Sequence, residues 1–447
     1  MRRVLIILLL ALGAMLAAVW LGATPGSATL EFAGWRFDSS FGALAILAAV
    51  AGFALIVVDR LWRWIAGAPT RIKMWRHARR ERHGYAALTR GLVAVAAGDP
   101  RSALREAALA DRLLGAPPAS LLLSAQAAQL AGDEASARKH LEAMRAAPET
   151  EFAALRGLVA IAMREGRDDE ALGLARRARE LRPDATWVSG ALIDLETKAA
   201  RWDDAALTID AARRQQMLPA PDADKKRAAA LHEAARGHEA KGDRREAIRA
   251  AERAFKLAPD RPEIAATLAT LYAKDARARA ASSLIEKEWT RAPHPELLDA
   301  YRKARPVPDA LQWIKQVERL AKLNPAHAYS HAALAEASLA AELWGEAKRH
   351  AQAAIDAEGG EPRASLCRLM ARIEEESGGV ASVAKSWLAR AADAPGDPAW
   401  TCDSCGHPHA EWHAICRRCG AFDKLVWSAP ARLAPAFVAI DTTKDQQ

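Results

Sequence analysis

A turn-and-alanine signature that recurs every 34 residues constrains this chain more than any other feature. Gly98, Gly132, Gly166 and Ala200 each mark a turn, and an alanine follows five residues after each of them. Around these turns apolar residues recur at steps of three and four, which predicts helices rather than strands. Glycine permits a tight turn, and alanine is small enough for two antiparallel helices to pack closely. We therefore expect a row of helical hairpins.

The row is expected to cover residues 83–393. A later copy of the signature has Gly242 and Ala247, and Pro183 and Pro259 are expected to end second helices, because proline cannot continue a helix interior. Residues 291–325 contain five prolines and are expected to be irregular. The period resembles that of the tetratricopeptide repeat (TPR) family, which implies about seven or eight hairpins with a protein-binding concave face. The alternative is an array that only separates the N-terminal segment from a C-terminal module.

Two apolar stretches precede the array. Residues 4–22 and 41–58 contain no charged side chain, and each is close to the roughly 20 residues that a helix needs to cross a bilayer. Residues 1–60 are therefore predicted to form a two-span membrane anchor with a loop over 23–40. A cleaved signal peptide is the alternative for the first stretch, but the second would still hold the chain in the membrane.

The distribution of charge predicts the orientation. Eight Lys/Arg lie between Arg60 and Arg82, whereas the predicted loop holds one. The positive-inside rule then places both termini and the array in the cytoplasm. The basic juxtamembrane segment, residues 61–82, could also bind anionic lipid headgroups. Residues 83–447 carry 52 Lys/Arg and 51 Asp/Glu, which excludes a body that coats nucleic acid.

Near the end of the chain, residues 399–428 contain two CxxC pairs separated by ten residues. Two residues between thiols let both sulfurs reach one ion, and two such pairs complete a tetrahedral thiolate site. Zinc is the predicted metal and iron the alternative; disulfides are disfavoured because the cytoplasm keeps thiols reduced. Such a closed site leaves no open position for hydrolytic chemistry. The predicted ligands of this metal knuckle are Cys402, Cys405, Cys416 and Cys419.

The sequence contains no signature of a common enzyme class. GxGxxG after a strand, GxxxxGK[ST], HExxH and GxSxG are all missing, so no catalytic residue is predicted. His327 and His331 share a helix face and could bind metal or haem, but solvent-facing histidines are commoner. Cys367 is predicted to be a small core residue. Residues 429–447 are predicted to be a flexible tail.

The N-terminal architecture resembles the HemY family of bacterial inner-membrane TPR proteins. The resemblance is most specific over residues 1–100, where two spans enclose a loop ending in LEFAGWRFDSS and the basic segment RLWRWIAGAPTRIKMWRHARRERHGY leads into the hairpins. It implies a multi-pass inner-membrane protein associated with haem (tetrapyrrole) biosynthesis. Such a protein would be a non-catalytic scaffold for haem-biosynthesis enzymes, or a carrier of haem or porphyrin.

The knuckle departs from the shorter HemY proteins. It is similar to the C-terminal rubredoxin-like module of LapB-type adaptors, which regulate lipopolysaccharide synthesis through a membrane protease but have one span. The expected fold is all-α, with two transmembrane helices, a TPR-like α-solenoid and a rubredoxin-like knuckle. The expected function is a haem-associated scaffold, with a LapB-like adaptor and a porphyrin carrier as alternatives.

Overall fold

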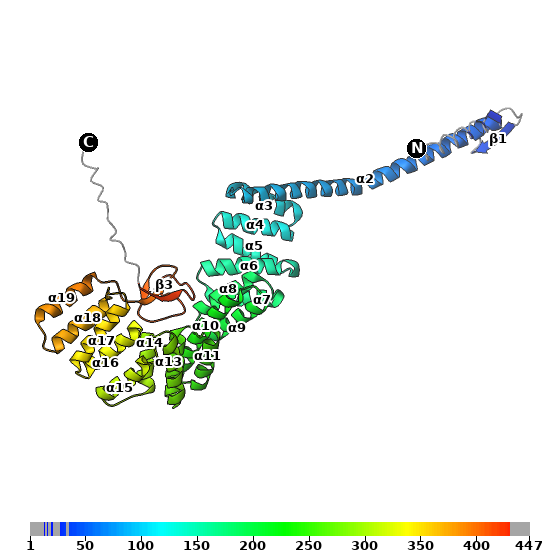
Figure 1. Cartoon of the computed structure of the whole chain (residues 1–447). Helices are drawn as coiled ribbons and strands as arrows, with labels where there is room; N and C mark the ends of the chain where they lie inside the picture. Colours follow the sequence, from blue (N-terminus) through cyan, green and yellow to red (C-terminus); the bar gives the residue numbers. More distant parts are fainter. Residues whose placement is uncertain (1–12, 14–15, 17–18, 21–26, 33–34, 430–447) are drawn as a thin grey trace, which may run out of the picture. The chain divides into compact units, whose positions relative to one another are not determined.

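The computed structural model describes residues 13, 16, 19–20, 27–32 and 35–429. Most of the predicted first span, and the predicted tail from residue 430 onward, lie outside these residues. The chain forms two compact units, Met1–Met144 and Arg145–Gln447. Helices make up most of both units (Figure 1), so the predicted all-α class is confirmed.

The first unit contains a strand hairpin followed by four helices. The strands are antiparallel, with Ser27 opposite Ser40 and Phe32 opposite Trp35. The predicted loop over 23–40 therefore contains a hairpin, because its apolar residues alternate with polar ones at the period of a strand. The elements are β1 (Ser27–Phe32), β2 (Trp35–Ser40), α2 (Phe41–Ala96), α3 (Pro100–Leu114), α4 (Pro118–Leu130) and α5 (Glu134–Arg145).

Helix α2 is 56 residues long and joins three segments with different sequence character: an apolar span, a basic segment and the start of the array. Its beginning, Gly42–Trp62, has a mean hydropathy of 2.3 and is long and apolar enough to cross a membrane. Among the described residues this is the single such segment. The helix then continues without a break through the basic segment and becomes the first helix of the array.

Two glycines allow α2 to approach its neighbours closely. A Cβ atom on Gly84 would lie 2.5 Å from Leu114 Cδ2, and one on Gly91 would lie 2.5 Å from Leu123 Cδ2. Both distances are too short for carbon atoms, so a larger residue at either position would force the facing leucine side chain to move. The same need for small residues at helix crossings explains the buried alanines of the array.

The second unit contains fourteen helices and a three-stranded sheet among its described residues. The helices are α6 (Pro148–Arg164), α7 (Asp168–Leu181), α8 (Thr186–Lys198), α9 (Trp202–Arg214), α10 (Ala220–Ala240), α11 (Arg244–Leu257), α12 (Pro262–Lys274), α13 (Ala278–Arg291), α14 (Pro295–Ala304), α15 (Ala310–Ala321), α16 (Ala328–Ala340), α17 (Trp344–Ala357), α18 (Ala364–Glu376) and α19 (Ala381–Asp393). The strands are β3 (Ala399–Cys402), β4 (Pro408–His409) and β5 (Leu425–Ser428).

The predicted turns have the backbone that the signature requires. Gly98 has φ +72° and Ala200 has φ +53°, both in the left-handed region. The next amide bonds back to a carbonyl five residues earlier, as from Asp99 N to Ala94 O at 2.9 Å, which is the Schellman arrangement that ends a helix. The alanines five residues after seven such turns are completely buried: Ala103, Ala137, Ala171, Ala205, Ala247, Ala281 and Ala347. The predicted helical hairpins are confirmed.

The prediction that residues 291–325 are irregular is wrong. They form α14 and α15, because the prolines lie where helices tolerate them. Pro295 is the first residue of α14, a position whose amide needs no helical partner. Tyr301 and Trp313 from these helices join Trp289 in a buried aromatic core, and the Trp289 indole nitrogen donates to Ser330 Oγ at 3.1 Å.

Enlarging one crossing alanine should destabilise a hairpin. Ala103 in α3 is fully buried, and the methylene and methyl groups that Ala103→Leu adds would overpack the crossing at a cost of roughly 1–3 kcal/mol. The expected result is a lower midpoint in thermal unfolding followed by far-UV circular dichroism. Ala108→Leu is the matched control, since Ala108 is exposed on the same helix. Equal midpoints for the two variants would contradict the packing argument.

Candidate metal centre and its docking surface

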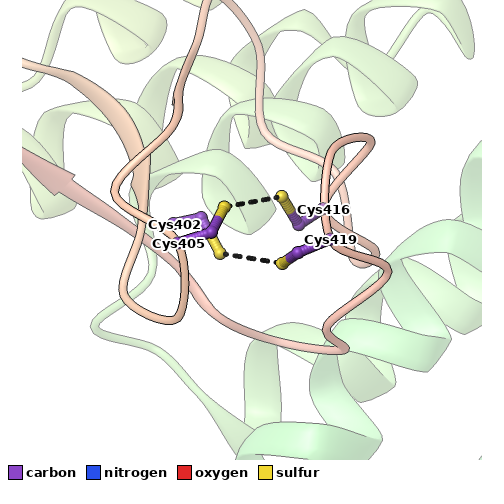
Figure 2. A group of neighbouring side chains, drawn as sticks. All are labelled: Cys402, Cys405, Cys416 and Cys419. Carbon is purple, nitrogen blue, oxygen red and sulfur yellow. Dashed lines mark hydrogen bonds between the residues drawn. The ribbon is translucent and has the colours of Figure 1, made fainter.

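The four predicted cysteines lie on two similar turns that face each other (Figure 2). Each turn is closed by a glycine with positive φ, +68° at Gly406 and +73° at Gly420. Gly406 N donates to Cys402 O at 2.7 Å, and Gly420 N donates to Cys416 O at 2.8 Å. Both glycines therefore occupy a conformation that L side chains rarely adopt, as the sequence pattern predicts.

The spacing of the sulfurs suits one tetrahedral ion. All four Sγ atoms lie within 4.8 Å of one another. The Cys402–Cys419 and Cys405–Cys416 pairs are each 3.7 Å apart. Zn–S bonds of about 2.3 Å at tetrahedral angles separate neighbouring sulfurs by about 3.8 Å. All four thiols are free, and 3.7 Å is far longer than a disulfide bond. The cluster could thus hold a metal ion.

Hydrogen bonds favour a thiolate at Cys416. Burial raises the pKa of this thiol, but the amides of Cys419 and Arg418 and the ring of His409 outweigh burial and lower the pKa to about 5. His409 Nε2 lies 3.4 Å from the sulfur. Because metals bind the deprotonated thiol, this arrangement prepares one ligand for an ion.

The knuckle, residues 399–428, shares its core with the repeat array of the second unit. Its sheet has the order β4-β3-β5, with Trp400 opposite both His409 and Trp427. Ala229 of α10 belongs to the same buried cluster as Trp400, Trp412, Cys402 and Cys416. A segment this small has little core of its own, so α10 completes it.

Side chains of helix α10 bind the backbone that leads into the second cysteine turn. Glu233 Oε1 accepts a hydrogen bond from Ala414 N at 3.0 Å, and Arg236 donates to Trp412 O at 3.3 Å. The His232 ring stacks on the Trp412 indole with centroids 4.8 Å apart. These contacts position the backbone just before Cys416.

Arg261, at the start of α12, links the array to the knuckle by a buried ion network. Its guanidinium lies 2.5 Å from Glu263 Oε1 and 2.8 Å from Asp423 Oδ1, and it covers the Trp412 ring at 5.0 Å. The Arg261, Glu263 and Asp423 side chains are 15%, 3% and 11% exposed. Because Asp423 belongs to the knuckle, this network depends on docking.

The other side of the knuckle contacts α14 and α16. Trp400 Nε1 donates to Glu296 Oε1 at 2.7 Å, and Trp427 Nε1 donates to Tyr329 Oη at 3.2 Å. The His294 ring meets the Trp427 ring edge-on at 4.5 Å. The knuckle therefore spans the first helices of successive hairpins, on the inner side of their curve (Figure 1).

Burial disfavours the charged forms of three other groups at this interface. It lowers the pKa of His232 to about 3 and that of His294 to about 4, so both imidazoles are uncharged at pH 7. Burial, aided by nearby carboxylates, raises the pKa of Glu296 to about 7. The uncharged forms of these groups lose less solvation free energy on burial than the charged forms would. This suits their packing against the tryptophans of the knuckle.

The cysteines follow from the sequence pattern, but the groups of the array that contact the knuckle do not. Arg261 and Asp423 are 162 residues apart, and Glu233 and Ala414 are 181 residues apart, so no local spacing links them. His327 and His331 do not act together: His327 Nδ1 accepts from Tyr329 N, whereas His331 faces His350. Cys367 is fully buried, as predicted.

Comparison with known proteins agrees with the N-terminal architecture. Residues 26–132 match the family model described as HemY protein N-terminus. Over an alignment of 461 residues the chain is 30% identical to the probable magnetosome protein Mms48 of Magnetospirillum gryphiswaldense, covering 99% of this chain and 96% of the relative.

Several solved structures match this chain at low identity and low TM-score. The Naa15/Naa10 complex bound to HypK matches with a TM-score of 0.40 and 15% identity, over 70% of this chain and 58% of that chain. MamA from Desulfovibrio magneticus RS-1 matches with a TM-score of 0.24 and 14% identity, over 37% of this chain and 93% of that chain. The TPR domain of P58(IPK) matches with a TM-score of 0.23 and 16% identity, over 69% of this chain and 92% of that chain.

The family assignment rests on the sequence matches, and the fold assignment rests on the hairpins of the chain itself. Family membership and helical repeats both support the role of an adaptor that binds proteins. From its N-terminal match and its full-length relative, the chain belongs to the HemY family.

Proposed function

We propose that this protein is a non-catalytic adaptor anchored in the bacterial inner membrane, where its array gathers enzymes of haem biosynthesis on the cytoplasmic side. The observation that carries the proposal is the continuity of α2. One helix contains a segment able to cross a membrane and also the first helix of the array. A partner bound to the array would thus be held near the bilayer.

The basic part of α2 supports an additional contact with anionic lipids. Every residue from Lys73 to His83 is exposed, and this stretch contains Arg76, Arg79, Arg80 and Arg82. Each cation near an anionic membrane surface contributes on the order of 1 kcal/mol. The two-span topology and the cytoplasmic position of the array belong to the same proposal. The two spans rest on the apolar stretches 4–22 and 41–58, and the orientation rests on the charge pattern.

Zinc is the proposed metal of the knuckle, with Cys402, Cys405, Cys416 and Cys419 as ligands. The sulfur spacing and the closed four-thiolate arrangement support a structural site. Iron would fit the same sulfurs, and the visible absorption of an iron–thiolate centre would distinguish the two metals.

Haem association is tested by deletion of the gene and by recovery of the tagged protein from membranes. We expect porphyrin intermediates to rise in the deletion strain and tetrapyrrole enzymes to co-purify with the tagged protein. Unchanged porphyrin and haem levels would count against the haem role. Recovery of a membrane protease would favour the LapB-like alternative, and a Soret band on titration with haem would favour a carrier.

A second candidate role follows from the full-length relative, which is named a probable magnetosome protein. An adaptor of the same build could organise proteins on a magnetosome membrane. Fractionation of cells that form magnetosomes would separate the roles. Enrichment of the tagged protein with the magnetosomes supports this candidate, and an even distribution over the inner membrane contradicts it.

A further inference from the structure

Two histidines of one helical hairpin face each other at a distance from the metal knuckle. His331 lies near the beginning of α16, and His350 lies in α17. Their Nδ1 atoms are 3.4 Å apart while the ring centroids are 5.6 Å apart, so these two nitrogens lie on facing edges of the rings. Hydrogen bonds of N–H groups normally span about 2.7–3.2 Å. The contact is therefore long for a direct hydrogen bond between the rings.

The same spacing suits two ligands of one metal ion. Zn–N bonds of about 2.0–2.1 Å at a tetrahedral angle separate two ligand nitrogens by about 3.3–3.4 Å. The 3.4 Å between His331 Nδ1 and His350 Nδ1 matches this separation. Imidazole is a good ligand for zinc, copper and nickel. Since the two rings come from neighbouring helices, an ion between them would bridge α16 and α17.

Both imidazoles are held in the neutral form that binds metal. Burial, followed by the charge of Arg349, lowers the pKa of His331. Burial, Arg349 and His331 together lower the pKa of His350, while Glu346 and Glu318 act in the opposite direction. At pH 7 each ring therefore has a free lone pair on one nitrogen. The two carboxylates also place negative charge near the position that a cation would occupy.

The second nitrogen of His350 has two competing neighbours. Glu346 Oε2 lies 3.8 Å from His350 Nε2, and Arg349 Nη2 lies 3.3 Å from the same atom. Metal-binding histidines usually donate their other N–H to an acceptor such as a carboxylate, which fixes the tautomer and orients the ring. Glu346 can accept this hydrogen, whereas the guanidinium of Arg349 has only donors. Glu346 therefore favours metal binding at Nδ1, and Arg349 opposes it.

We propose that His331 and His350 bind one divalent transition-metal ion through their Nδ1 atoms, with zinc as the preferred ion. The His350 side chain is 16% exposed, so water can reach the ion and complete its coordination. Two protein ligands hold an ion less firmly than four thiolates, so this ion should exchange readily and be lost on dialysis. Its binding would lock the α16–α17 hairpin. The proposed site is separate from the knuckle and does not depend on the adaptor function.

The test is a titration of the full-length protein in detergent with Zn²⁺. The protein is purified without a histidine tag and dialysed so that zinc stays only in the four-cysteine site. Calorimetry and elemental analysis should then find one additional ion per chain. Loss of an outer-shell partner alone typically weakens metal binding 10- to 100-fold, so His331→Gln or His350→Gln should weaken it about tenfold or more. Arg349→Ala should instead tighten binding about three- to tenfold, because it removes a cation next to the ion.

His327→Asn is the matched control. His327 lies one helical turn before His331, and its Nδ1 accepts from Tyr329 N at 3.1 Å instead of joining the pair. Asparagine keeps an acceptor at this helix start, so the helix should remain capped. The affinity for the additional zinc ion should be unchanged in this variant.

A second measurement reports on the hairpin itself. Zinc should slow hydrogen exchange of α16 and α17 amides in the unaltered protein and have no such effect in His350→Gln, because an ion that binds the folded state stabilises it. Circular dichroism without added zinc verifies that the variants fold. The proposal is overturned if no additional ion binds, or if His331→Gln and His350→Gln both bind it as tightly as the unaltered protein. It is also overturned if His327→Asn weakens binding as much as His350→Gln, which would assign the ion to the pair His327 and His331.

Discussion

Replacing Cys402 and Cys416 by serine is expected to release the knuckle from the array. The double variant should lose its bound metal, and trypsin should then cut after Arg417 and Arg418, which are exposed on the second cysteine turn. The reason is that a thirty-residue segment with a small core gains much of its folding free energy from the metal. Elemental analysis and mass spectrometry of the trypsin fragments measure the two effects.

Cys367→Ala is the control for this experiment. Cys367 is a buried thiol of α18 outside the cluster, so its replacement should leave one metal ion per chain and the same trypsin resistance as the unaltered protein. The prediction fails if the serine variant keeps its metal. It also fails if the metal-free knuckle stays resistant, because docking on α10, α12 and α14 would then suffice to fold it.

Replacing Arg261 by alanine should have the second large effect. The change leaves the carboxylates of Glu263 and Asp423 buried without their cation and removes the guanidinium from the Trp412 ring. Loss of one partner from a buried ion network typically costs about 3–5 kcal/mol. We expect the knuckle to become sensitive to trypsin at a lower denaturant concentration, while the helical signal of the rest of the array changes little.

A neutral version of the network separates lost charge from lost packing. Arg261→Met combined with Glu263→Gln and Asp423→Asn keeps the volume of the site and removes the unpaired charges. This triple variant should recover much of the stability that Arg261→Ala loses. Arg249→Ala is the control on the exposed surface of α11, where loss of a salt bridge costs at most about 1 kcal/mol. Similar losses for Arg261→Ala and Arg249→Ala would contradict a structural role for the buried network.

Local patterns were sufficient for the helices and the cysteine turns. The spacing of Gly98, Gly132 and Gly166 predicted turns because each one needs a left-handed residue at a fixed place. The CxxC pairs predicted a cluster because two residues between thiols fix the turn that brings them together. Within each turn the interacting groups are fewer than ten residues apart, so backbone geometry relates them; the two cysteine turns themselves meet across 11 and 17 residues.

The prediction was wrong where prolines were taken as helix breakers without regard to their position in the helix. The five prolines in 291–325 suggested an irregular segment, but Pro295 begins α14 and Trp313 of α15 joins the buried core. The strand hairpin of β1 and β2 was not predicted. Its two alternating segments are short and lie between two long apolar stretches, so the whole interval was treated as a loop.

The sequence by itself determined the repeated helical hairpins, the apolar character of the anchor and the identity of the four thiols, because each depends on residues close together along the chain. Only the tertiary structure decided that the knuckle lies on the inner side of its own array. There it contacts Arg261, His232 and Glu296. Those residues meet the knuckle across more than 100 positions of sequence. The stacking of the hairpins decides which array residues lie close enough to contact the knuckle. No periodicity in the sequence predicts these contacts.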